Sequence, residues 1–126
     1  GSVRCVLESV DELVSEVSKE IHHYFKIDAI SIALRGNRKG KLNIYSTHYL
    51  DEANPAHEQS EVDEAGTLSE RVFKSKEILL LNLNEQDPVA PYERMLFNTW
   101  GNKIQTLCLL PLKSGNTIIG VLKNAQ

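Results

Sequence analysis

No stretch of this 126-residue chain approaches the roughly 20 apolar residues that a membrane-spanning helix needs, and no signal peptide is recognisable. Charge of one sign is not in excess either, since the net charge is −3. That balance gives no electrostatic reason to expect nucleic acid or an anionic membrane as a direct partner. The length suits a single domain, and we expect a soluble protein of the cytoplasm.

Cysteine is scarce as well, with Cys5 and Cys108 lying about a hundred residues apart. A domain of this length can build a core without a disulfide, so we expect two reduced thiols. A thiol-based enzyme, such as a sulfoxide reductase, would need an exposed thiolate with a resolving thiol nearby. Cys108 instead lies in an apolar run, and Cys5 precedes the first predicted helix. The sequence therefore predicts no enzyme of this kind.

Residues that could hold a metal are present but poorly spaced. His22 and His23 are adjacent, so a helix would point them about 100° apart and they would not converge on one ion. His48 and His57 are separated by a predicted loop and have no cysteine nearby. The acidic run 58–64 lacks the Asp/Asn alternation and central glycine of a calcium-binding loop. We therefore predict neither a metal nor another cofactor, and interpret the acidic run as a solvated loop.

The first half of the chain predicts one helix and two strands. Ser9 and Glu12 form a capping box, and apolar residues then recur every three or four positions up to Phe25. Residues 29–35 and 41–48 have the composition of strands and are joined by a turn with glycine at both ends. A helix packed on a hairpin is the expected result.

The second half begins with a polar segment, residues 51–66, which we expect to be a surface loop. Thr67 and Glu70 form a second capping box, which opens a helix that runs through Ser75. Acidic side chains beside this helix start are expected to occupy the positive end of its dipole already. The apolar residues 78–82 then predict a short buried strand.

A further helix and a closing hairpin complete the pattern. Pro88 and Pro91 suit the first turn of a helix, and Gly101 suits its end. The side chains of this helix that are expected to face inward are Tyr92, Leu96, Phe97 and Trp100. Residues 106–123 hold two apolar runs around Lys-Ser-Gly-Asn and predict a hairpin, which we expect to form the central pair of the sheet.

The element order α-β-β-α-β-α-β-β predicts an α/β (α+β) sandwich on a central antiparallel sheet. The N-terminal helix should cover one face, and the later short helices and loops should form a pocket on the other. Residues 3–8 are expected to be the remnant of a linker, and residues 9–126 the domain itself.

Several segments resemble GAF domains, the small-molecule sensing modules of many bacterial regulators. These segments are DELVSEVSKEI in the first helix, AGTLSERVFKSKEILLLN from the second helix into a strand, and LCLLPL with NTIIGVLK in the hairpin. The stretches PAHEQSEVDEAGTLSERVFKSKE and APYERMLFNTWGN are similar to the second of two GAF domains in a sigma-54-dependent enhancer-binding regulator. By this resemblance the chain ends before the C-terminal helix of a GAF domain.

The resemblance implies a non-enzymatic sensing domain that responds to formate or another small anion. Formate would relieve a restraint on a separate AAA+ ATPase domain of the same protein, which would then activate transcription. The companion GAF domain and a second copy in a homodimer are further implied partners. The alternative is a GAF module without a ligand, which serves dimerisation or interdomain repression.

A formate site would need one cation and one or two hydrogen-bond donors. Arg71, which neighbours an apolar residue on its helix, is the predicted cation, with Arg94 in reserve. Tyr45 and His48 are the predicted donors, because both lie near the end of a strand at the expected pocket rim. Formate has three heavy atoms, so about 4.5 kcal/mol is the ceiling on its binding free energy. This corresponds to a dissociation constant of about a millimolar.

Overall fold

A computed structural model describes residues 10–25, 27–36, 38–49, 56–83, 90–101 and 103–126. Its strands are β1 (Ala29–Arg35), β2 (Lys41–His48), β3 (Ala56–Asp63), β4 (Leu79–Asn82), β5 (Thr106–Ser114) and β6 (Thr117–Ala125). Its helices are α2 (Val10–Phe25), α3 (Leu68–Ser75) and α4 (Pro91–Trp100). No described helix is long and apolar enough to cross a membrane.

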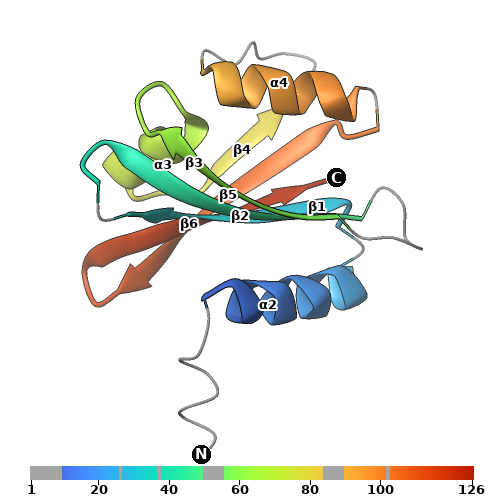
Figure 1. Ribbon diagram of the computed structural model, residues 1–126, viewed down its shortest axis with the longest axis horizontal. Helices are drawn as coiled ribbons and strands as arrows, with labels where there is room; N and C mark the ends of the chain where they lie inside the picture. Colours follow the sequence, from blue (N-terminus) through green and yellow to red (C-terminus); the bar gives the residue numbers. More distant parts are fainter. Residues whose placement is uncertain (1–9, 26, 37, 50–55, 84–89, 102) are drawn as a thin grey trace, which may run out of the picture.

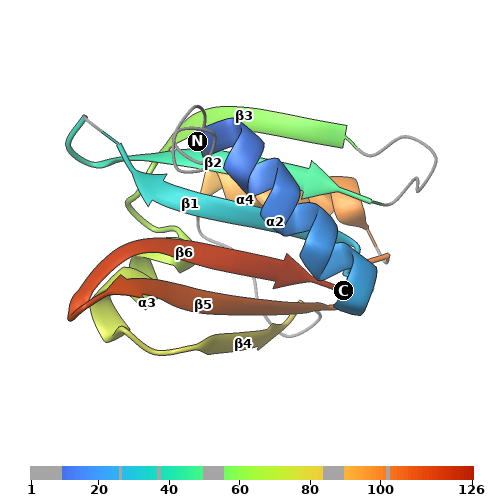
Figure 2. The same cartoon turned by 90° about the horizontal axis from the view of Figure 1, so that it is seen from below.

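The strands form one six-stranded sheet in the order β3-β2-β1-β6-β5-β4, and every neighbouring pair is antiparallel. Helix α2 lies on one face of the sheet, and α3 and α4 lie on the other (Figure 1). Seen from the α2 side, this helix runs obliquely across the sheet (Figure 2). The predicted α+β sandwich is therefore confirmed, including the assignment of helices to the two faces.

The main core lies between the sheet and α3/α4. It is a continuous cluster of buried side chains from four inner strands and both helices, including Leu42, Ile44, Val72, Phe73, Trp100, Leu107, Leu109 and Val121. Side chains of a strand alternate between the two faces of a sheet. Ala29 and Ala33 of β1 belong to this cluster, so Ile30 and Ile32 point to the α2 face, where both are buried. Both faces of β1 are therefore covered.

The prediction of a surface loop over residues 51–66 was wrong for the part that the structure describes. Residues 56–63 form β3, which pairs with the whole of β2. The strand lies at the edge of the sheet, and every side chain in it except Val62 is exposed. With both sides solvated, no alternation of polar and apolar residues arises, so the sequence carried no strand signal.

The predicted hairpin is present as β5 and β6, but it is not the central pair. The centre of the sheet is β1 with β6, whereas β5 lies between β6 and the edge strand β4. The strand predicted over residues 78–82 is present as β4 but is not buried as a whole. Its Leu81 is buried, whereas Leu80 on the other face is 73% exposed. Ser9, Cys5 and Pro88 lie outside the described residues.

Candidate ligand-binding site

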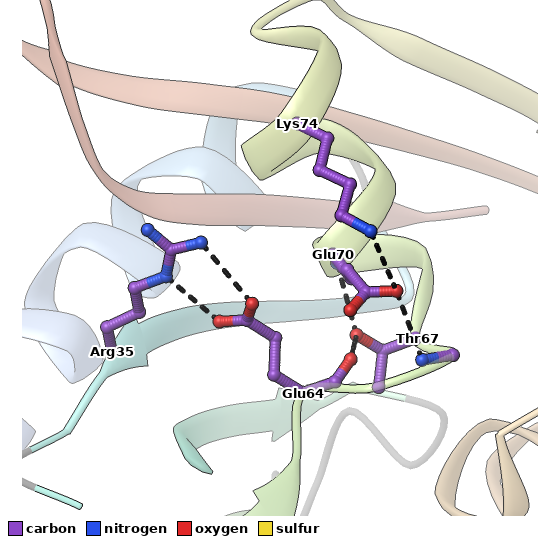
Figure 3. Close-up of polar contacts among 6 residues, drawn as sticks. Arg35, Glu64, Thr67, Glu70 and Lys74 are labelled. Carbon is purple, nitrogen blue, oxygen red and sulfur yellow. Dashed lines mark hydrogen bonds and ion pairs between the residues drawn. The ribbon is translucent and has the colours of Figure 1, made fainter. Parts of the chain in front are cut away.

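The start of α3 has one half of the predicted capping box, since Thr67 caps the helix but the Glu70 carboxylate binds the residue before this N-cap. The Thr67 hydroxyl accepts a hydrogen bond from the Glu70 N–H at 3.1 Å, and the Glu70 carboxylate accepts one from the Gly66 N–H at 3.2 Å (Figure 3). Lys74, one turn later, lies 3.9 Å from that carboxylate. The first N–H groups of a helix have no partner within the helix. The N–H of Leu68, the first residue of α3, therefore needs an acceptor from elsewhere.

Glu64, at the end of the acidic run, does not supply that acceptor. Its carboxylate binds the guanidinium of Arg35 through two contacts of 2.9 and 3.3 Å (Figure 3). The same guanidinium lies 4.1 Å above the centre of the Phe73 ring. Glu64 is thus paired with the end of β1 rather than with the start of α3.

The acceptor is Glu93, from the first turn of α4. Both carboxylate oxygens of Glu93 accept from the Leu68 N–H, at 2.9 and 3.0 Å, and the residue is 1% exposed. An anion at a helix start is stabilised by the helix dipole as well as by the hydrogen bond. Carboxylates do occupy this helix start, but they belong to Glu70 and Glu93, so the expectation that the neighbouring acidic run would do so was wrong.

Lys123 of β6 completes a buried ion pair with this carboxylate. The Lys123 Nζ lies 3.6 Å from Glu93 Oε2, and Lys123 is 5% exposed. Burial raises the pKa of the Glu93 carboxyl and lowers the pKa of the Lys123 ammonium, because each charge is desolvated, and the opposite charge of the partner opposes both shifts. The pair links β6, α3 and α4 at one point.

The sheet next to Lys123 is polar on the side of β1 and apolar on the side of β5, where Leu109 lies opposite Lys123. Ser31 of β1 lies between Lys123 of β6 and Ser46 of β2 in the register of the sheet. Both serines are buried. The ring of Tyr92 is 5.6 Å from the Lys123 Nζ. Burial raises the pKa of Tyr92, while a hydrogen bond with Ser46 lowers it. An ammonium, two hydroxyls and a backbone N–H are a donor set suited to a small carboxylate.

A groove of about 350 Å³ lies between β3 and the start of α4. Its lining includes Val62, Asp63, Pro91 and Tyr92. Tyr92 thus borders both the groove and the Lys123 ammonium. The Tyr92 side chain is the boundary between solvent on this side and the buried pair.

Three of the four predicted ligand residues, all except Tyr45, lie on this side of the sheet. Arg71 is exposed on α3, but it is close enough for its charge to lower the pKa of Glu93. His48 lies beneath α4, where its Nδ1 accepts a hydrogen bond from Trp100 Nε1–H at 3.4 Å. Arg94 is exposed on α4.

Tyr45 is not brought to this face. It lies opposite Ile32 of β1 in the register, and the odd-numbered positions of β2 share the α2 face with that residue. Tyr45 and His48 are three positions apart on one strand, so they point to opposite sides of the sheet. Both lie near the strand end as predicted, but a single ligand cannot contact both.

Sequence reasoning missed Lys123 and Glu93. The available signal for Lys123 was its position in the last strand, where Val121 and Ala125 are the inward residues on either side. A lysine at an inward position of a strand is rarely buried without a partner. Glu93 looked like an ordinary first-turn acidic residue, and nothing local distinguishes it from an exposed one.

His48 provides a pH-dependent test of the contacts beneath α4. Burial lowers its pKa, while the charge of Glu58 opposes that shift. The unfolded chain therefore binds this proton first as the pH falls, so stability is lost from about pH 6.5 downward and levels off below the lowered pKa. We expect His48→Gln to remove this part of the pH dependence in urea unfolding between pH 7.5 and 5. Equal slopes for the variant and the wild type would contradict it.

A metal site and a reactive thiol are the two catalytic features that the sequence raised. Among them, no group of three or more His, Cys, Asp or Glu side chains could hold a metal ion. Cys108 is a free thiol, and burial raises its pKa, which disfavours the reactive thiolate. The buried charged pair is the chemically distinctive feature of the described core.

Comparison with known proteins finds close relatives in sequence. The formate hydrogenlyase transcriptional activator of Salmonella typhimurium (strain LT2) is 82% identical over 117 residues, which are 93% of this chain and 17% of the activator. The activator FhlA of Escherichia coli (strain K12), with the same name, is 78% identical over the same share of each chain. The chain thus spans less than a fifth of the curated relatives, which are regulatory proteins by name.

Solved structures with this fold are more distant. The GAF domain of A. aeolicus nlh2, in an inactive state, has a TM-score of 0.69 at 18% identity and covers 94% of this chain and 68% of its own. The NreA protein of Staphylococcus aureus, described as mutated in its nitrate binding site, has a TM-score of 0.59 at 17% identity, over 92% of this chain and 81% of its own. The profile of the GAF domain family matches residues 9–123. The chain belongs to the GAF domain family.

Proposed function

We propose that this domain senses formate within a sigma-54-dependent activator of formate hydrogenlyase genes, as the second of its GAF domains. The observation that carries the proposal is the buried Lys123 ammonium, which lies beside a helix N–H in a donor set that already holds a carboxylate. The 78% identity to an activator named for formate hydrogenlyase supports formate as the carboxylate. Lys123 takes the place of Arg71 as the primary cation, and Arg71 adds positive charge at the edge of the site.

The donor groups around Lys123 suit a carboxylate as small as formate. The buried hydroxyls of Ser31 and Ser46 can donate to a carboxylate held at Lys123, and Tyr92 would separate it from the groove. NreA, which shares the fold, is described as having a nitrate binding site, and nitrate is also a small planar monoanion. The regulatory consequence in the cytoplasm would be relief of restraint on a separate AAA+ ATPase domain.

An amide NMR titration of the 126-residue chain tests this function. We expect saturable shifts with formate in the millimolar range, clustered around Lys123, Ser31 and Ser46, and much smaller shifts with chloride or acetate at matched ionic strength. Lys123→Met should abolish the saturable shifts, whereas Lys113→Met, on an exposed lysine of the same hairpin, should retain them. Shifts that are equal for all three anions would contradict formate sensing.

The alternative function is that of a GAF module without a ligand, for dimerisation or interdomain repression. One observation favours it: Glu93 already neutralises Lys123 and satisfies the Leu68 N–H, so the buried pair is complete in itself. On this alternative Lys123→Met changes stability only, and the titration shows no saturable shifts with formate.

A further inference from the structure

We infer that Glu93 is a tethered substitute for the effector, which fills the carboxylate site until a small carboxylate displaces it. The inference rests on the proposed function and adds a regulatory step to the same site. On this inference, the effector competes with the Glu93 carboxylate. When the effector binds, the contacts of Glu93 with Lys123 and with the Leu68 N–H are broken.

The geometry around Glu93 is that of a bound carboxylate. Its two oxygens share the Leu68 N–H at 2.9 and 3.0 Å, and one of them lies 3.6 Å from the Lys123 ammonium. These partners recognise a carboxylate group and nothing else of the side chain. Formate consists of that group alone, so the same partners suit it equally well.

Burial makes the two carboxylates mutually exclusive. Glu93 is 1% exposed and Lys123 5% exposed, so water does not screen the charges between them. A second carboxylate beside the same ammonium would meet the repulsion of the first, and it would find almost no exposed surface of Lys123 to contact while Glu93 stays in place. A carboxylate that pairs with Lys123 must therefore take the place of Glu93.

Room for the exchange exists next to α4. The groove of about 350 Å³ is lined by Ala90, Pro91 and Tyr92, the residues that immediately precede Glu93. The first turn of α4 therefore borders open volume on one side and the buried pair on the other. The Glu93 side chain can leave Lys123 by a movement of this turn toward the groove.

The exchange has a structural consequence. Glu93 is the side chain through which α4 holds the first N–H of α3, and through Lys123 it also holds β6. When a free carboxylate replaces it, the covalent link from α4 to this point is lost, although the charge on Lys123 is still matched. Effector binding therefore frees the first turn of α4 from α3 and from β6, while Trp100 still holds the end of the helix on the core, and a neighbouring domain could detect this change.

The test compares formate binding by the wild-type chain and by Glu93→Gln in the same NMR titration. Glutamine keeps the shape of the side chain but cannot neutralise Lys123, so formate meets a weaker internal competitor. We expect the dissociation constant for formate to fall at least about tenfold, since an intramolecular competitor lowers the apparent affinity by the fraction of open sites. In the wild type, formate should shift the Leu68 amide. Glu77→Gln, the same change at an exposed glutamate after α3, should leave the affinity unchanged.

Further variants keep the test decisive. Glu93→Asp retains the charge but shortens the reach of the carboxylate, so its affinity for formate should lie between wild type and Glu93→Gln; it serves alone if the glutamine variant does not fold. Glu93→Gln with Lys123→Met removes both charges and should lose the formate response. Binding that is Lys123-dependent but no tighter in either Glu93 variant would overturn the exchange and leave the sensing function standing. Absence of saturable binding in the wild type and both variants would overturn the sensing function itself.

Discussion

Lys123→Met is expected to lower the free energy of unfolding by about 3–5 kcal/mol at pH 7, because it leaves the carboxylate of Glu93 buried without a cation. The loss should shrink as the pH falls, since burial raises the pKa of Glu93 and a protonated carboxyl needs no cation. Urea unfolding monitored by far-UV circular dichroism at pH 7 and pH 5 measures both effects.

The double variant Glu93→Gln with Lys123→Met separates the charge from the packing. Replacing both members of a buried pair by uncharged groups of similar size is often neutral, so most of the loss should be recovered. Lys113→Met, on an exposed lysine of β5, serves as the matched control and should change stability by less than about 0.5 kcal/mol. A Lys123→Met variant as stable as this control would show that the ammonium is not held in the buried pair.

Trp100→Ala is the second substitution with a large expected effect, a loss of about 3–5 kcal/mol in the free energy of unfolding. Trp100 is 3% exposed at the end of α4, and its ring stacks on Phe97 with the ring centres 5.6 Å apart. Truncation would leave a large cavity between α4 and the sheet. It would also expose His48, whose lowered pKa should then return toward the ordinary value for histidine.

Met95→Ala provides the comparison for Trp100→Ala, because Met95 lies on the same helix but is 64% exposed. Its effect on the free energy of unfolding should be below about 1 kcal/mol. Chemical denaturation gives the stabilities, and an NMR titration of the His48 ring protons gives the pKa. Similar losses for the two variants would mean that α4 does not pack on the core through Trp100.

The sequence predicted those elements whose two sides face different environments. Strand β1 alternates between small residues beneath α3/α4 and Ile30 or Ile32 beneath α2, so its period was visible. The capping box at Thr67 also gave the start of α3 to the residue. Strand β3 was not predicted because it lies at an edge of the sheet with both sides in water. Polar residues are favoured on both sides of such a strand, so its sequence does not alternate between apolar and polar residues.

The site was less predictable than the fold because it depends on distant contacts. Glu93 and Lys123 are thirty positions apart in the chain, and only the packing of α4 on β6 brings their charges to 3.6 Å. Helical spacing alone predicts Arg71 as the cation of the ligand site. Arg71 does lie on the α3/α4 side of the sheet, but its side chain is exposed and not in the core. The face on which Tyr45 lies was predictable from the sequence. Adjacent residues of a strand point to opposite faces of a sheet, so Tyr45 must lie on the face opposite to that of the buried Ile44.

The polar composition of β3 also bears on how the molecule behaves at high concentration. An edge strand offers unpaired backbone groups on which a strand of another molecule can add, the first step toward aggregation. The exposed side chains of Glu58, Glu61 and Asp63 lie on this edge strand, the last two in ion pairs with Arg38 and Lys41, and charged side chains on an edge strand disfavour the addition of another strand. At the opposite edge β4 extends for only four residues. Charged side chains on β3 and the short length of β4 thus both disfavour edge-to-edge aggregation of the sheet.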